Sequence, residues 1–267
     1  MSNQPESDFL LSKWYLDCVD ANGNLFIGYS AELRWNRIRI HFTNGFEYFD
    51  DSGLNEQKTL KYFPRPDMNS EHLTWTLPTW NIRASWDRID PRILSELLHN
   101  DYGFIQWNCH FPKAQSVISI SGKDSIRGLG YAEKLELTIK PWNLPFHELH
   151  WGRYLSENDT IIWIAWFGRE DFSILYHNGK PFSDAIIAEN EVQFNQGLSR
   201  LAFNDTIDLR KGSLKDTALS HLTKITKLFP KQIIRTFENK WRSKGTFKIG
   251  GKALSKGWVI HEVVEWK

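Results

Sequence analysis

The chain has 267 residues, of which 24% are charged and 41% hydrophobic, and its 33 basic and 32 acidic residues leave a formal net charge of +1. This composition describes a globular protein that can bury a large core, as one big β domain or as two smaller ones. The near-neutral balance provides no global field that would attract nucleic acid, and no nucleic-acid partner is expected.

The first eight residues are polar, and no apolar run approaches the ~20 residues needed to span a bilayer. We therefore expect a soluble, cytoplasmic protein with no signal peptide and no stable membrane insertion. Cys18 and Cys109 lack metal-ligand spacing and are expected to be reduced and buried. Because phosphate-binding, dinucleotide-binding and G-x-S-x-G motifs are absent, kinase, dehydrogenase and hydrolase functions lack support.

Short segments of alternating hydrophobicity fill the first half of the chain. Predicted strands there cover residues 9–19, 25–35, 38–42, 73–77, 80–86, 104–111 and 114–120. The dipeptide Asn44-Gly45 predicts a turn, and residues 50–66 are polar and irregular. The spacing of Ile93, Leu94, Leu97 and Leu98 predicts a short helix over 91–98.

The second half repeats this pattern. Predicted strands cover residues 128–139, 147–155, 160–167 and 257–266, and Asn178-Gly179 marks a hairpin turn within 174–180. Ser213 and Asp216 form a capping box, which predicts a helix that ends before Pro230. Many short strands with little helix predict an all-β protein of barrels or sandwiches. A short echo between residues 28–33 and 130–135 raises the alternative that the two halves are related.

The strand over 128–139 carries an acid on an apolar face. Alternation places Glu133 with Tyr131, Leu135, Leu137 and Ile139, and loss of hydration favours the neutral, proton-donating form of a carboxyl group. Glu133 is therefore a candidate acid. The structural alternative is a buried ion pair with a cation such as Arg153.

Aromatic and charged residues form a series of short motifs between residues 107 and 166. They are Trp107, Gly130-Tyr-Ala-Glu133, Pro141-Trp142, His150-Trp-Gly-Arg153 and Trp163-Ile-Ala-Trp166. This order resembles the hydroxyneurosporene synthase (carotenoid hydratase) and AttH-like superfamily, and the similarity runs from about Phe9 to Trp266. The resemblance implies two lipocalin-like β domains packed together, which we place at residues 9–125 and 126–267, with one or two short helices and an apolar ligand.

The resemblance also implies roles for individual residues. In the hydratase branch an acid two positions after a tyrosine protonates an alkene near a supporting tryptophan, and these positions match Glu133, Tyr131 and Trp107. The family pattern has a histidine where this chain has Ile105, and its acid is usually aspartate. No cofactor, metal or nucleotide is implied.

A second set of residues is expected to contact the substrate. It consists of His150, Arg153, Trp163, Trp166 and Glu262, where Trp163 and Trp166 would form the wall of the site together with Trp107. The structural alternative for Arg153 is an ion pair with an internal acid, and that for Glu262 is an acid kept hydrated at a C-terminal edge strand. His147 and His150 would face opposite sides of a strand, so no metal site is expected.

Two hypotheses for function follow. The first is a cofactor-independent enzyme that binds a hydrophobic terpenoid or polyketide-like molecule and catalyses acid-assisted hydration, cyclisation or isomerisation. The alternative is a non-catalytic lipocalin-like carrier of a small hydrophobic ligand. A small hydrophobic molecule is the expected partner in both, and the sequence does not indicate an oligomeric state.

Overall fold

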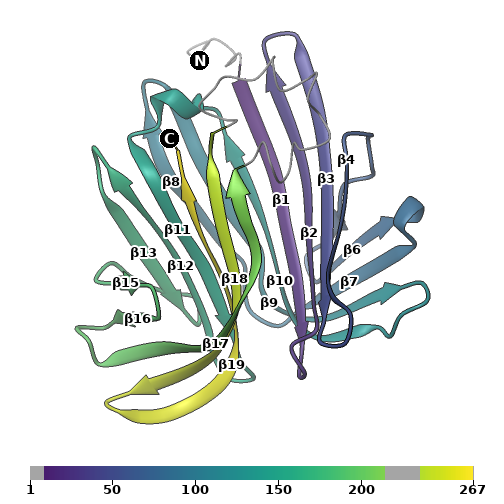
Figure 1. The fold of residues 1–267 in the computed structure, drawn as a ribbon. Helices are drawn as coiled ribbons and strands as arrows, with labels where there is room; N and C mark the ends of the chain where they lie inside the picture. The colour runs from purple at the N-terminus through teal and green to yellow at the C-terminus, as the bar shows by residue number, and fades with distance from the viewer. Residues whose placement is uncertain (1–8, 214–234, 267) are drawn as a thin grey trace. The chain divides into compact units, whose positions relative to one another are not determined.

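The computed structural model describes residues 9–213 and 235–266, and the predicted helix after Ser213 lies outside these residues. The chain divides into two compact units, Met1–Asn143 and Leu144–Lys267. Each unit is built around one curled antiparallel sheet (Figure 1), which confirms the predicted all-β class with two lipocalin-like domains.

The first unit holds ten strands and two short 3-10 turns. Its strands are β1 (Phe9–Asp20), β2 (Leu25–Trp35), β3 (Ile38–Phe49), β4 (Gly53–Thr59), β5 (Asp67–Met68), β6 (His72–Leu77), β7 (Ile82–Arg88), β8 (Ile93–Asn100), β9 (Gly103–Ile120) and β10 (Ile126–Leu137). The 3-10 turns are η1 (Pro78–Trp80) and η2 (Pro141–Asn143).

Strand β1 lies near the middle of the first sheet, whose order is β4-β3-β2-β1-β10-β9-β7-β6-β5, with β8 also paired to β9. β10 pairs with β1 on one side and with β9 on the other. The two units therefore divide after Asn143, because β10 completes the first sheet. The boundary predicted from the sequence lay after residue 125 instead.

The first core lies on one face of this sheet. Alternating residues of β1, among them Trp14, Leu16 and Cys18, pack there with Trp75 and Trp86 from β6 and β7. The period-2 pattern seen in the sequence thus fixes which side chains enter the core.

In the residues that the structure describes, the second unit holds nine strands. They are β11 (Phe146–Leu155), β12 (Thr160–Gly168), β13 (Phe172–His177), β14 (Lys180–Phe182), β15 (Ile186–Ala188), β16 (Glu191–Phe194), β17 (Ser199–Ser213), β18 (Phe237–Ile249) and β19 (Lys252–Glu265).

The second sheet repeats the plan of the first. Its order is β14-β13-β12-β11-β19-β18-β17-β16-β15, so its first strand again pairs with its second and its last. Its core contains Tyr154, Trp163, Phe194, Phe203 and Phe247, with other buried apolar side chains.

Three local predictions were wrong. Residues 93–100 form β8, because pairing with β9 satisfies their backbone groups. Asn44-Gly45 lies inside β3, with Gly45 opposite Gly28, whereas Asn178-Gly179 does form a turn with positive φ at both residues. The echo between residues 28–33 and 130–135 does not relate two halves, since both segments flank β1 in the first unit.

Candidate active site

Glu133 lies on β10, a strand that is buried on both faces. Ala132 points to the first core, and Glu133 lies on the other face, opposite Tyr15 of β1 and Cys109 of β9. Its side chain is buried, with 6% of the residue exposed.

Two donors converge on one oxygen of Glu133. Trp107 Nε1 donates a hydrogen bond to Glu133 Oε2 over 2.5 Å, and the Tyr131 hydroxyl donates to the same atom over 2.5 Å. Both donors are fully buried. The structure thus brings together the three residues that the sequence predicted as catalytic, although Trp107 contributes its N–H group as well as its ring.

The neighbours of Glu133 stay protonated at neutral pH. Burial raises the pKa of the Cys109 thiol well above its usual value, and the neighbouring carboxyl groups act in the same direction. Burial likewise raises the pKa of the Tyr131 phenol. Tyr131 is therefore a neutral hydrogen-bond donor to the carboxyl group.

A second Tyr-x-acid pair escaped sequence reasoning. The Tyr15 hydroxyl donates to Asp17 Oδ2 over 2.9 Å on β1, and Asp17 is completely buried opposite Tyr131. The rings of Tyr15 and Tyr131 lie 6.0 Å apart. The repeated spacing Tyr15-Leu-Asp17 and Tyr131-Ala-Glu133 was the signal in the sequence that could have revealed this pair.

The two tryptophans predicted as a wall lie on opposite faces of β12. Trp163 belongs to the core of the second unit and stacks on Phe203 at 5.8 Å. Trp166 stacks on Phe146 at 4.8 Å and on Phe172 at 4.2 Å. The structure therefore does not bring Trp163 and Trp166 together, and their contact with a substrate stays a prediction.

The polar residues predicted to contact substrate also have partners within the second unit. Arg153 Nη1 donates to the carbonyl oxygen of Trp258 over 2.9 Å. His150 Nε2 lies 2.5 Å from Glu148 Oε1. Glu262 contacts the buried Lys240 ammonium group on β19, a strand paired on both sides and not an edge strand. Substrate contact by Arg153, His150 or Glu262 stays a prediction.

Glu133 and Glu262 occupy corresponding places in the two sheets. β10 pairs with β1 and β9, as β19 pairs with β11 and β18. Each acid lies five residues after a glycine, Gly128 or Gly257, at which an added Cβ atom would clash with the backbone of the neighbouring strand. Opposite Glu262 lies Lys240, whereas opposite Glu133 lies Cys109. The same position thus carries an ion pair in one unit and a carboxyl group held by neutral donors in the other.

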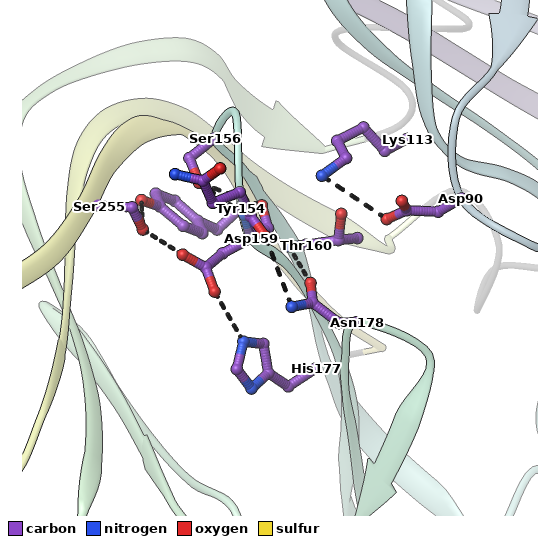
Figure 2. Close-up of polar contacts among 10 residues, drawn as sticks. Asp90, Lys113, Tyr154, Ser156, Asp159, Thr160, His177, Asn178 and Ser255 are labelled. Carbon is purple, nitrogen blue, oxygen red and sulfur yellow. Dashed lines mark hydrogen bonds and ion pairs between the residues drawn. The ribbon is translucent and has the colours of Figure 1, made fainter.

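A further polar network lies in the second unit, at the turn between β11 and β12 (Figure 2). Asp159 accepts from Ser255 Oγ over 2.5 Å and lies 2.9 Å from His177 Nε2, and the Tyr154 hydroxyl lies 3.0 Å from Ser255 Oγ. A nucleophilic triad needs histidine between the acid and the hydroxyl, but here the acid lies between them. We therefore assign this network to holding the turn against β13 and β19.

Some kinds of site are absent from the part of the chain that the structure describes. There, no three His, Cys, Asp or Glu side chains come together in a way that could hold a metal ion. The same residues contain no helix with the length and apolarity that crossing a membrane requires.

Comparison with known proteins gives matches in structure alone. No protein-family model matches the sequence, and no curated protein matches it. CghA matches with a TM-score of 0.61 and 11% identity, over 97% of this chain and 89% of that one. A putative AttH from Nitrosomonas europaea matches with a TM-score of 0.58 and 10% identity, over 98% and 94% of the two chains.

Kievitone hydratase from Nectria haematococca matches with a TM-score of 0.56 and 8% identity, over 98% of this chain and 90% of that one. At these identities the likeness establishes the fold. This chain has the fold of CghA, AttH and kievitone hydratase, which confirms at the level of structure the resemblance read from its aromatic and acidic motifs.

Proposed function

We infer that this protein is a cofactor-independent enzyme that binds a hydrophobic, terpenoid or polyketide-like molecule and catalyses acid-assisted hydration, cyclisation or isomerisation. The observation that carries this proposal is the buried Glu133 carboxyl group with Trp107 and Tyr131 both donating to Oε2.

In this proposal Glu133 is a neutral acid, and its hydrogen-bond partners decide which of its oxygens carries the proton. Because the indole N–H can only donate and Tyr131 also donates to Oε2, the acidic hydrogen belongs on Oε1. When Oε1 gives its proton to an alkene carbon, negative charge develops on the carboxylate and both hydrogen bonds to Oε2 strengthen. Preorganised donors of this kind favour the transition state over the ground state.

The proton balance of each reaction is then simple. Protonation of the alkene by Glu133 leaves a carbocation, which an adjacent aromatic face stabilises without forming a bond. Attack by water gives hydration, attack by a second alkene gives cyclisation, and loss of a neighbouring proton gives isomerisation. In each case the released proton returns to the Glu133 carboxylate, which restores the neutral acid.

Two of the structural relatives support this class of function. One is named a hydratase, and CghA has a solved structure with the small molecule Sch210972, which matches this chain with a TM-score of 0.55. These facts concern those proteins, and they make a small organic molecule a reasonable ligand to test here.

The proposal is tested by deuterium transfer from solvent. Protein is incubated in D2O with geranylgeraniol, an acyclic prenyl alcohol, and with any molecule that native mass spectrometry finds bound after purification from the source cells. We expect carbon-bound deuterium with the wild-type protein and a loss of about 10²-fold or more in Glu133→Gln.

Glu136→Gln is the matched control, because Glu136 lies on the same strand with its side chain on the other face. It should keep the wild-type rate. If the wild-type protein and Glu133→Gln bound the ligand with equal affinity and the wild-type protein transferred no deuterium, the carrier function would be favoured instead. Equal transfer by Glu133→Gln would remove Glu133 as the acid.

A further inference from the structure

Basic side chains surround Glu32 in the first unit. Glu32 lies on β2 opposite His41 of β3, on the face of the sheet that also carries the core residue Phe26. Arg34 Nε lies 3.4 Å and Arg39 Nη2 lies 3.1 Å from Glu32 Oε1. Arg65 contacts Glu32 Oε2, and His41 Nδ1 lies 3.7 Å from the same atom.

The charges in this cluster do not balance. Three guanidinium groups meet one carboxylate, which leaves two positive charges in surplus, and within residues 9–213 and 235–266 no other carboxylate contacts these arginines. Arg34 also lies directly opposite Arg39 in the register of β2 and β3. Like charges at directly opposed positions of a sheet destabilise it unless a negative charge lies between them.

The buried acid holds the arginines in place while leaving them accessible. The Glu32 side chain is 7% exposed, whereas those of Arg34, Arg39 and Arg65 are 46%, 59% and 44% exposed. Each guanidinium group carries five N–H donors, and Glu32 has only two oxygens to share among three of these groups. Donors therefore remain on all three arginines for a second anion.

The third arginine comes from a segment that is fixed by its own contacts. Arg65 lies between β4 and β5, where Trp75 Nε1 donates to the carbonyl oxygen of Pro64 over 2.9 Å. The ring of Tyr62 packs edge-on against His41 at 5.0 Å. Three separate stretches of chain thus meet around Glu32, so the arrangement of charges is built by the fold.

We propose that Arg34, Arg39 and Arg65 form a binding site for a phosphate or diphosphate group. Tetrahedral oxyanions accept paired N–H donors from guanidinium groups, and a doubly charged group matches the surplus of two positive charges. The site is separate from Glu133, which lies on the other face of the sheet, and it does not depend on the function inferred for Glu133.

The test is calorimetric titration of the full-length protein with inorganic pyrophosphate at low ionic strength. We expect saturable binding by the wild-type protein, weakened at least tenfold in Arg39→Ala and abolished in the double variant Arg34→Ala/Arg39→Ala. The matched control is Arg200→Ala, since Arg200 is also exposed and paired with a single acid, Glu191. It should bind as the wild type does.

Two-dimensional NMR of the histidine rings gives a second readout that reports folding as well. Pyrophosphate should shift the His41 resonances in the wild-type protein and leave them unmoved in the double variant, whose other histidine resonances show that it remains folded. Absence of heat and of any His41 shift at millimolar pyrophosphate overturns the proposal. Equal binding by the double variant overturns it as well.

The source of the phosphate is distinguished by a second titration. Phosphatidylcholine vesicles with and without phosphatidic acid are sedimented with the protein. Retention that requires phosphatidic acid and is lost in Arg39→Ala identifies a lipid headgroup, whereas binding of pyrophosphate alone identifies a free phosphate or diphosphate compound. Binding to neither overturns the proposal.

Discussion

At the scale of single residues, the environment of an acid separates Glu133 from Glu262. Both were identified from the alternation of their strands, and both occupy corresponding places in their sheets. What the sequence could not supply was the partner across the strand, Cys109 in one case and Lys240 in the other, because register depends on which strands pair. For the same reason Asp17 was missed, although its spacing from Tyr15 repeats that of Glu133 from Tyr131.

The buried ring of His261 gives a prediction of how the stability of the second unit depends on pH. Burial, together with the charges of Lys240 and His150, lowers the pKa of His261 from 6.5 to about 3. The folded state therefore keeps this ring neutral while the unfolded chain takes up a proton below about pH 6.5. Above pH 6.5 the His261 ring is neutral in both states and costs no stability. As the pH falls from 6.5 toward 3, the free energy of unfolding decreases by up to about 1.4 kcal/mol per pH unit.

The measurement is urea unfolding at a series of pH values between 7 and 4. His261→Gln should unfold more easily at pH 7, because the bond with Ser243 Oγ at 3.2 Å is changed, but its stability should fall less steeply with acid. His99→Gln is the control, since His99 is exposed, and it should follow the wild-type curve. An equally steep curve for His261→Gln would contradict the prediction.

At the scale of elements, alternation predicted most long strands, whereas local turn signals were less reliable. Asn178-Gly179 forms a turn with positive φ at both residues, but Asn44-Gly45 continues β3, where Gly45 pairs with Gly28 of β2. The helical spacing over 91–98 was overridden by pairing with β9. In each failure a contact distant in sequence decided the conformation, and no local pattern encodes such a contact.

The close approach of the Trp163 ring to Gly152 of β11 gives a prediction for this strand. A Cβ atom on Gly152 would lie 2.1 Å from Trp163 Cζ2, and Trp163 is buried in the second core. Gly152→Ala should therefore cost about 1–3 kcal/mol through overpacking. It should lower the thermal midpoint and weaken the near-ultraviolet circular dichroism of the tryptophans.

Gly45→Ala provides the comparison, because its Cβ atom would meet the nearest heavy atom at 3.4 Å, an ordinary contact. This variant should stay close to the wild type in both measurements. If Gly152→Ala were as stable as Gly45→Ala, Trp163 would have to be free to move, contrary to its place in the core.

At the scale of the whole molecule, the sequence predicted the class and the number of domains but misplaced the boundary between them. The motif around Glu133 resembles the start of a new domain because it follows the turn at Gly122, yet β10 pairs with the first strand of the chain. In this sheet the first strand, β1, pairs with the last, β10. A boundary placed by following the sequence misses this pairing, because the two strands lie far apart along the chain.

This closing contact yields the final prediction, on fragments of the first unit. A fragment of residues 1–143 contains all ten strands of the first sheet, and we expect it to unfold cooperatively in urea with a β-rich circular dichroism spectrum. A fragment of residues 1–125 lacks β10, so β1 and β9 each lose a partner from the middle of the sheet. Unpaired backbone groups in a buried strand are costly, and the shorter fragment should be unfolded or aggregated. Adding residues 126–143 as a separate peptide should restore the cooperative transition. Cooperative unfolding of residues 1–125 alone would show that the first core does not need β10, and the boundary predicted from the sequence would then stand.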